Sequence, residues 1–214
     1  GEDVDLGYHT ITNDGDITTA PGSEIITNGG DVNFDAADDI RLDDDITTNG
    51  GTVNLVAGDL FELDDFNDII DTTGSDGNVS IRANRFDLDG SINAGTAGIT
   101  LGRATAGQLN IGDWNYASFL LDQGELNRMS ANRLQVGVQA NGVDNRVLVD
   151  NANLSNFNQA IFNTKTPSTP TGRDVVFYGT NSFNALEVNA DDHVGLARDA
   201  SVDTTGNVNI TTNT

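Results

Sequence analysis

A strand-and-turn pattern recurs along this chain, and the repeat restricts its fold more than any other feature. The clearest copy has the segments Val32–Ala36, Ile40–Leu42 and Ile46–Thr48, separated by short turns. Equivalent copies begin at Val53 and Val79, which gives spacings of 21 and then 26 residues. Self-similarity at this period indicates one small structural unit used many times.

Within each segment apolar and polar residues alternate, which predicts strands with one buried face. Three short strands cannot bury these faces alone, but coiling the chain and stacking the coils does so. We therefore predict an all-β fold over residues 1–214, a single right-handed parallel β-helix. It would have three short strands per coil of about 21 residues and roughly 10 coils. A sandwich of hairpins is the alternative, but it does not require the same strand order in every repeat.

Two stretches interrupt the repeat, at about residues 113–133 and 152–173. The first contains a short helical turn within residues 120–129, which would place Leu126 and Met129 on the same side. The second is polar, holds two of the three prolines, and is expected to project as a loop. Loops on a rigid scaffold are common binding sites, although a tolerated insertion is the simpler interpretation.

Four residues in these stretches are candidate binding-loop residues. Trp114 and Tyr116 form an aromatic pair that could stack on a sugar ring, or could instead cover a hydrophobic gap. Lys165 and Arg173 are positive charges within a long acidic stretch.

The first interruption also carries a family pattern. The pattern has a leucine, then an acidic residue before a second leucine, then an Ile/Met-x-Ala step, and finally a Leu-x-Ile/Val-Gly strand. The matching residues here are, in that order, Leu121, Glu125-Leu126, Met129–Ala131 and Leu134–Gly137. With the Gly-Gly-x-Val-x-Leu-x-Ala coils, the chain resembles the filamentous-haemagglutinin-like exoproteins. That resemblance implies a secreted or surface-anchored adhesin, exported through an outer-membrane partner pore. The N-terminal secretion domain and C-terminal end module of such proteins are not recognisable, so a mature chain or a window of a longer one is expected.

Charge and composition exclude several classes of function. The net charge of −23, from 33 acidic and 10 basic residues, opposes binding to nucleic acid and to anionic membrane surfaces. No apolar run approaches the length of a transmembrane helix, so no membrane insertion is expected. Without cysteine, neither a disulfide nor a thiolate zinc site can form.

Runs of aspartate fall at the predicted coil corners. Clustered carboxylates suit calcium, which takes six to eight oxygen ligands, so a weak calcium site is a hypothesis for Asp43, Asp44, Asp45, Asp64 and Asp65. No other cofactor is expected. The alternative is a solvated acidic edge that keeps the rod soluble and discourages sideways association.

Catalysis is not expected. His9 and His193 each lack a second histidine or cysteine at ligand spacing, and ordinary surface histidines explain them. Parallel β-helices also include polysaccharide lyases and hydrolases, which need a carboxylate pair together with cationic groups near the substrate. Carboxylates are too numerous here to be informative and the cations are scattered.

The resulting hypothesis is an extracellular structural and adhesive rod, secreted or held at a bacterial cell surface. Its partners would be a host or neighbouring-cell surface, through glycan or matrix. One alternative is a filament subunit that stacks end to end as a homopolymer. A second alternative is a polysaccharide lyase or hydrolase built on a β-helix.

Overall fold

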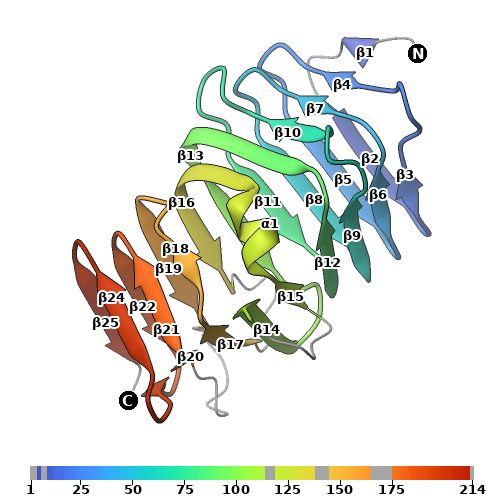
Figure 1. The fold of residues 1–214 in the computed structure, drawn as a ribbon. Coiled ribbons are helices and arrows are strands. Elements are labelled where there is room, and N and C mark those ends of the chain that lie inside the picture. Colours follow the sequence, from blue (N-terminus) through green and yellow to red (C-terminus); the bar gives the residue numbers. More distant parts are fainter. Residues whose placement is uncertain (1–3, 6–8, 114–118, 138–144, 165–174, 213–214) are drawn as a thin grey trace.

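The chain forms a parallel β-solenoid whose coils stack from one end of the molecule to the other (Figure 1). The computed structural model describes residues 4–5, 9–113, 119–137, 145–164 and 175–212. All strand pairings described are parallel and join one coil to the next, as in the pairing of Val32 with Val53. The predicted all-β parallel β-helix is thus confirmed.

The largest sheet has 13 strands in two rows, which meet where single long strands pass through the corner between them. The first row consists of β2 (His9–Asn13), β5 (Val32–Ala36), β8 (Val53–Ala57), β11 (Val79–Arg82), β13 (Ser91–Gly102), β16 (Met129–Val136), β19 (Gln159–Asn163), β22 (Leu186–Ala190) and β25 (Val208–Thr212). The second row consists of β1 (Val4–Asp5), β4 (Ile25–Ile26), β7 (Ile46–Thr47) and β10 (Ile69–Asp71), followed by the first halves of β13 and β16.

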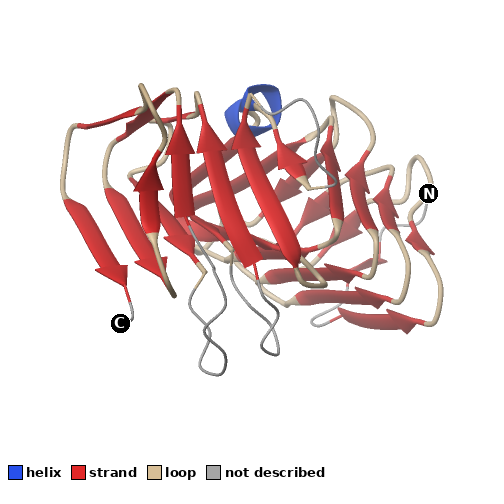
Figure 2. Ribbon diagram, turned by 90° about the horizontal axis from the view of Figure 1, so that it is seen from below, coloured by secondary structure: helices blue, strands red, loops and turns tan. Residues whose placement is uncertain are grey.

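Three smaller sheets complete the walls of the solenoid. They comprise β3 (Ile17–Thr18), β6 (Ile40–Leu42), β9 (Leu60–Leu63) and β12 (Arg85–Leu88); then β14 (Gly107–Gly112), β15 (Leu120–Leu121), β17 (Asn145–Asp150), β20 (Val175–Tyr178) and β23 (Val194–Leu196); then β18 (Asn153–Leu154), β21 (Thr180–Phe183) and β24 (Ser201–Thr204). One short helix, α1 (Gln123–Asn127), lies on one side of the stack (Figure 2).

The number of coils is about eight rather than the roughly ten expected. The expectation assumed a constant coil length, but the coils differ widely. Val32 pairs with Val53, 21 residues further on, whereas Ile99 pairs with Leu134, 35 residues further on. At the usual spacing between parallel strands the stack is about 40 Å long.

The core is a continuous column of apolar side chains inside the coils. In β5 and β8 alternate residues are buried, which is the predicted period of two. Phe162, Phe177 and Phe183 form an edge-to-face cluster in the C-terminal half, with ring centroids 5.9–6.1 Å apart. Phe61, Phe86 and Phe119 form a second series of ring contacts in earlier coils, so aromatic side chains fill the interior in both halves of the solenoid.

In the coils that contain β4, β7 and β10, the corner after the second row is built from a threonine and a glycine. Thr48 is completely buried, and its hydroxyl donates to the Gly51 carbonyl at 2.6 Å. Equivalent bonds are made by Thr27 to Gly30 and by Thr72 to Gly77. A Cβ on Gly51 would lie 2.0 Å from the carbonyl oxygen of Gly30 in the preceding coil, so only glycine allows this close stacking.

The first interruption of the repeat contains the expected helical turn. Helix α1 begins with a capping box, in which Asp122 accepts from the Glu125 amide and the Glu125 side chain accepts from the Asp122 amide. Leu126 and Met129 are both buried, as their predicted common orientation requires. β15 pairs with β14 and contacts β12, so it is an additional short strand between these two strands.

The second interruption begins later than its sequence suggested. Residues 153–154 and 159–163 form β18 and β19, which belong to ordinary coils. The polar segment 165–174 lies outside the described residues. No helix in the described part of the chain has the length and apolar character needed to cross a bilayer.

Candidate functional site: a polar pocket on the flank of the solenoid

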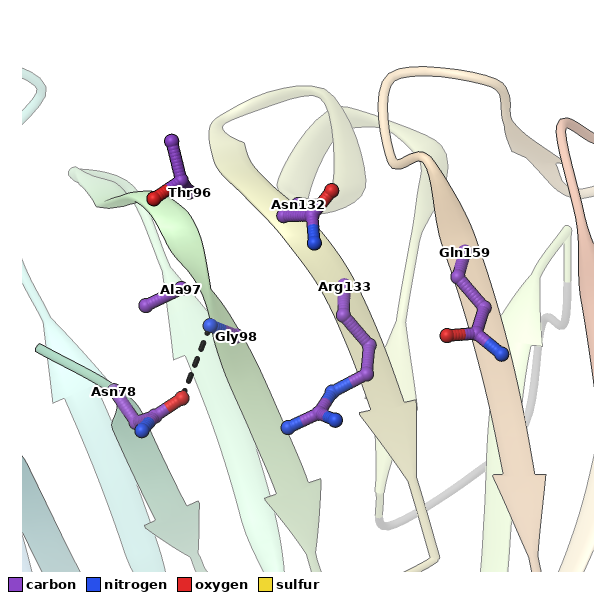
Figure 3. Close-up of a pocket in the computed structure, with 7 residues that line it drawn as sticks. All are labelled: Asn78, Thr96, Ala97, Gly98, Asn132, Arg133 and Gln159. Carbon is purple, nitrogen blue, oxygen red and sulfur yellow. Dashed lines mark hydrogen bonds between the residues drawn. The ribbon is translucent and has the colours of Figure 1, made fainter. Parts of the chain in front are cut away.

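A pocket opens where the corner between the two rows of the large sheet changes shape. In earlier coils this corner is a tight turn, such as Asn49-Gly50-Gly51 with positive φ at Asn49 and Gly50. In β13 the chain instead continues as an extended strand, and its register with β16 shifts between Asn93 and Gly98. The cavity here has a volume of about 190 Å³ (Figure 3). Its lining residues are Asn78, Thr96, Ala97, Gly98, Asn132, Arg133 and Gln159.

Arg133 is the only charged side chain among the lining residues. It projects from β16 toward Asn78 and Gly98 (Figure 3). A Cβ at Gly98 would lie 3.2 Å from Nε and 3.3 Å from Nη2 of Arg133, so the glycine leaves room for the guanidinium. Arg133 is exposed, and it makes no hydrogen bond or ion pair with any described residue.

The amide side chains of the pocket are held in place by their neighbours. Asn78 Oδ1 accepts from the Gly98 amide at 3.1 Å, and Asn132 Oδ1 accepts from Asn158 Nδ2 at 2.7 Å. Each therefore keeps an NH₂ group that bonds to no described residue. Together with the guanidinium of Arg133, these groups form a set of unused N–H donors.

Two acidic residues adjoin the pocket, and each is already bonded there. Gln159 Nε2 donates to Glu187 Oε2 at 3.1 Å, and the Thr96 hydroxyl donates to Asp76 Oδ1. Neither carboxylate is paired with Arg133. The arrangement can therefore receive an acceptor-rich ligand, above all a carboxylate, which a guanidinium binds through two parallel hydrogen bonds.

Trp114, Tyr116, Lys165 and Arg173 lie outside the described residues, as does the side chain of His9.

His193 is described and exposed, and its Nδ1 lies 2.9 Å from Asp192 Oδ1. It belongs to neither of the acidic clusters that could hold a metal among the described residues. The interpretation of His193 as a surface histidine agrees with this position.

The predicted aspartate set is only partly brought together. Carboxylate oxygens of Asp44 and Asp45 lie within 4.8 Å of each other and of Asp68, which the sequence had not singled out. Asp43, Asp64 and Asp65 are outside this cluster. Asp68 could have been found by aligning the coils, because the pairing of Ile46 with Ile70 puts Asp44 and Asp68 at equivalent positions.

A second acidic cluster contains Asp16, Asp38 and Asp39. Here Arg41 is the shared partner, with its Nη1 3.7 Å from Asp16 and its Nη2 bonded to Asp39. Its Nε also bonds to Glu62 in the next coil at 3.0 Å. The guanidinium of Arg41 thus already pairs with two of the three aspartates of this cluster.

Glu125 is the most strongly perturbed carboxyl in the described part of the chain. Burial raises its pKa from 4.5 to about 7, against the opposing effect of two backbone hydrogen bonds. Those bonds come from the amides of Asp122 at 2.7 Å and Leu88 at 3.1 Å. Perturbed carboxyls often mark active sites, but Glu125 lies outside the polar pocket, and its bonds join α1 to the end of β12.

The fold defines a class, that of parallel β-solenoids, and one flank of this solenoid carries a polar pocket. Comparisons of the chain with protein-family models, with curated proteins and with solved structures found no match.

Proposed function

We propose that this chain is part of an extracellular adhesive rod of the filamentous-haemagglutinin-like class, secreted or held at a bacterial surface. The observation that carries the proposal is the donor-rich pocket around Arg133, built on the flank of a stiff stack. The family pattern also coincides with structure, because Leu121, Leu126 and Leu134 are fully buried core residues of the coils. Export through an outer-membrane partner pore follows from the same class.

The proposed ligand is an acidic glycan of a host or neighbouring-cell surface. A sugar carboxylate would bind the Arg133 guanidinium, and sugar hydroxyls would accept from the free amide groups of Asn78 and Asn132. We expect this site to bind without catalysis, because the two adjoining carboxylates, Asp76 and Glu187, are bonded to Thr96 and Gln159 and do not line the pocket. We expect no turnover when an acidic polysaccharide is incubated with the protein and the products are followed by chromatography.

Binding of a uronic-acid oligosaccharide, measured by calorimetry, tests the proposal. Arg133→Ala is expected to weaken binding at least tenfold, because it removes the charged partner of the carboxylate. Arg82→Ala is the matched control, an outward-facing arginine in β11 that does not line the pocket. Equal affinity of the Arg133 and Arg82 variants, or no binding of any acidic oligosaccharide by the wild type, would contradict the proposal.

A second candidate function is end-to-end assembly. The last described coil exposes Leu196, Val208 and Ile210 by 64%, 46% and 56%. They contribute to an apolar cavity of about 210 Å³, and among the described strands β25 pairs only with β22. A second copy placing a parallel strand beside β25 would cover these side chains and extend the sheet.

Sedimentation velocity at increasing protein concentration tests this second function. Self-association is expected for the wild type and is expected to be lost in Ile210→Asp. Phe66→Asp is the control, because Phe66 is 74% exposed on the flank rather than at the end. A wild type that stays monomeric throughout, or association that survives Ile210→Asp, would rule this function out.

A further inference from the structure

Three aspartates from two successive coils meet at one corner of the rod, away from the polar pocket. Asp44 and Asp45 precede β7, and Asp68 precedes β10 in the next coil. Because Ile46 lies opposite Ile70 in the paired strands, Asp44 and Asp68 are stacked neighbours. One carboxylate oxygen from each aspartate lies within 4.8 Å of the other two.

Backbone amides hold the first two carboxylates in place. Asp44 Oδ1 accepts from the Asp45 amide at 2.9 Å, and Asp45 Oδ1 accepts from the Ile69 amide at 2.8 Å. The Oδ2 atoms of Asp44 and Asp45 make no hydrogen bond with any described residue. The cluster is therefore oriented by the fold itself, and it retains oxygens for another partner.

Asp68 supplies an independent sign that a partner is required. The residue is only 9% exposed, and its Oδ2 is a buried side-chain atom without a hydrogen-bond partner, the one such atom in the described part of the chain. A buried carboxylate oxygen without a hydrogen-bond partner, on a residue that belongs to a cluster of carboxylates, is costly unless a cation or a proton compensates it.

The other acidic cluster shows how this chain compensates such a site elsewhere. Arg41 forms ion pairs with Asp16, Asp39 and Glu62 and offsets part of their negative charge. Among the residues that the structure describes, no arginine is paired with Asp44, Asp45 or Asp68.

We propose that Asp44, Asp45 and Asp68 bind one divalent cation of the calcium type, which links two successive coils. Three carboxylate groups are hard oxygen ligands, and water would complete the shell of six to eight oxygens that calcium accepts in irregular geometry. Magnesium is less suited, because it needs a near-ideal octahedron. With three protein side chains as ligands, the affinity is that of a weak extracellular site, with Kd on the order of 0.1–1 mM. This site does not depend on the proposed adhesive function.

Calorimetric titration of the chelator-treated protein with calcium chloride tests the site. One saturable site is expected, with magnesium binding at least tenfold more weakly. Asp68→Asn should weaken calcium binding at least tenfold, because it removes a charged ligand. Asp38→Asn, in the cluster that Arg41 occupies, should bind calcium as the wild type does. Thermal melting in chelator establishes that both variants are folded, and Asp68→Asn should melt no lower than the wild type because it removes an uncompensated buried carboxyl.

Three outcomes would overturn the site. The first is no saturable heat of calcium binding up to about 10 mM, well above the expected Kd range. The second is calcium affinity in Asp68→Asn equal to that of the wild type. The third is an equal loss in Asp68→Asn and Asp38→Asn, which would mean that calcium only screens the acidic surface.

Discussion

Neutral to alkaline pH should destabilise this protein through one buried carboxyl, Glu125. Glu125 belongs to helix α1 and is only 8% exposed, and its pKa rises from 4.5 to about 7 because burial disfavours the charged form. Between pH 4.5 and about 7, Glu125 is therefore protonated in the folded state but ionised in the unfolded state. The stabilising contribution is complete below pH 4.5 and is lost as pH rises through 7.

The size of the effect follows from the same shift. Each unit of pKa difference corresponds to about 1.4 kcal/mol, so the whole contribution is about 3 kcal/mol. Between about pH 5 and pH 8.5, roughly 2–3 kcal/mol of unfolding free energy should disappear. Other acidic groups also titrate, and the effect of Glu125 must therefore be taken as a difference from a variant that cannot ionise at this position.

Glu125→Gln is that variant, and urea unfolding at fixed ionic strength is the assay. The variant should be less stable than the wild type at pH 5, because an amide cannot accept from both the Asp122 and Leu88 amides. The deficit should then shrink, or reverse, by about 2–3 kcal/mol as pH rises to about 8.5. Glu187→Gln, at a site without this burial, should show no such change. A stability difference between wild type and Glu125→Gln that is constant across this pH range would refute the reasoning.

Two further predictions concern the packing of the stack, and both are measured by chemical denaturation. Phe162→Ala should lower the free energy of unfolding by about 3–5 kcal/mol, because Phe162 is fully buried in an aromatic cluster. Phe66→Ala, at an exposed position, should change it by no more than about 0.5 kcal/mol. Similar losses in both variants would contradict the described core. Gly51→Ala should lower the free energy of unfolding by about 3 kcal/mol or more, because the new Cβ would lie 2.0 Å from the Gly30 carbonyl oxygen. Gly15→Ala should be tolerated, because no atom lies near the position of its Cβ. A folded Gly51→Ala protein of wild-type stability would disprove the close stacking of the coils.

The period-two alternation in the sequence was sufficient to predict the coils and their inner faces. Val32, Val53 and Val79 stack in register as their spacing suggested. The number of coils was overestimated because the 35-residue coil between Ile99 and Leu134 contains an additional strand, β15, and a helix, α1. The length of a coil depends on what its corners accommodate, and strand periodicity carries no information about that.

The sites were harder to predict than the fold. The pocket combines Asn78, Gly98, Arg133 and Gln159 from four successive coils, and their proximity depends on the register of unequal coils. Asp68 was missed for the same reason, since it joins Asp44 only once the pairing of adjacent coils is known. Local motifs were therefore sufficient to predict the strands. Sites that combine side chains from several coils could be predicted only once the strand pairing between those coils was known.

The unequal coil lengths have a consequence for how binding surfaces on such a rod can change. Each strand pairs with its equivalent in the neighbouring coil, so a whole coil can be gained or lost while the pairing rule stays the same. Removing residues 99–133, which is one coil by the pairing of Ile99 with Leu134, would delete Arg133 from the pocket and bring Gly98 opposite Gln159. Specificity in this architecture can thus be rearranged by duplication or excision of gene segments that encode single coils, with the apolar column conserved throughout.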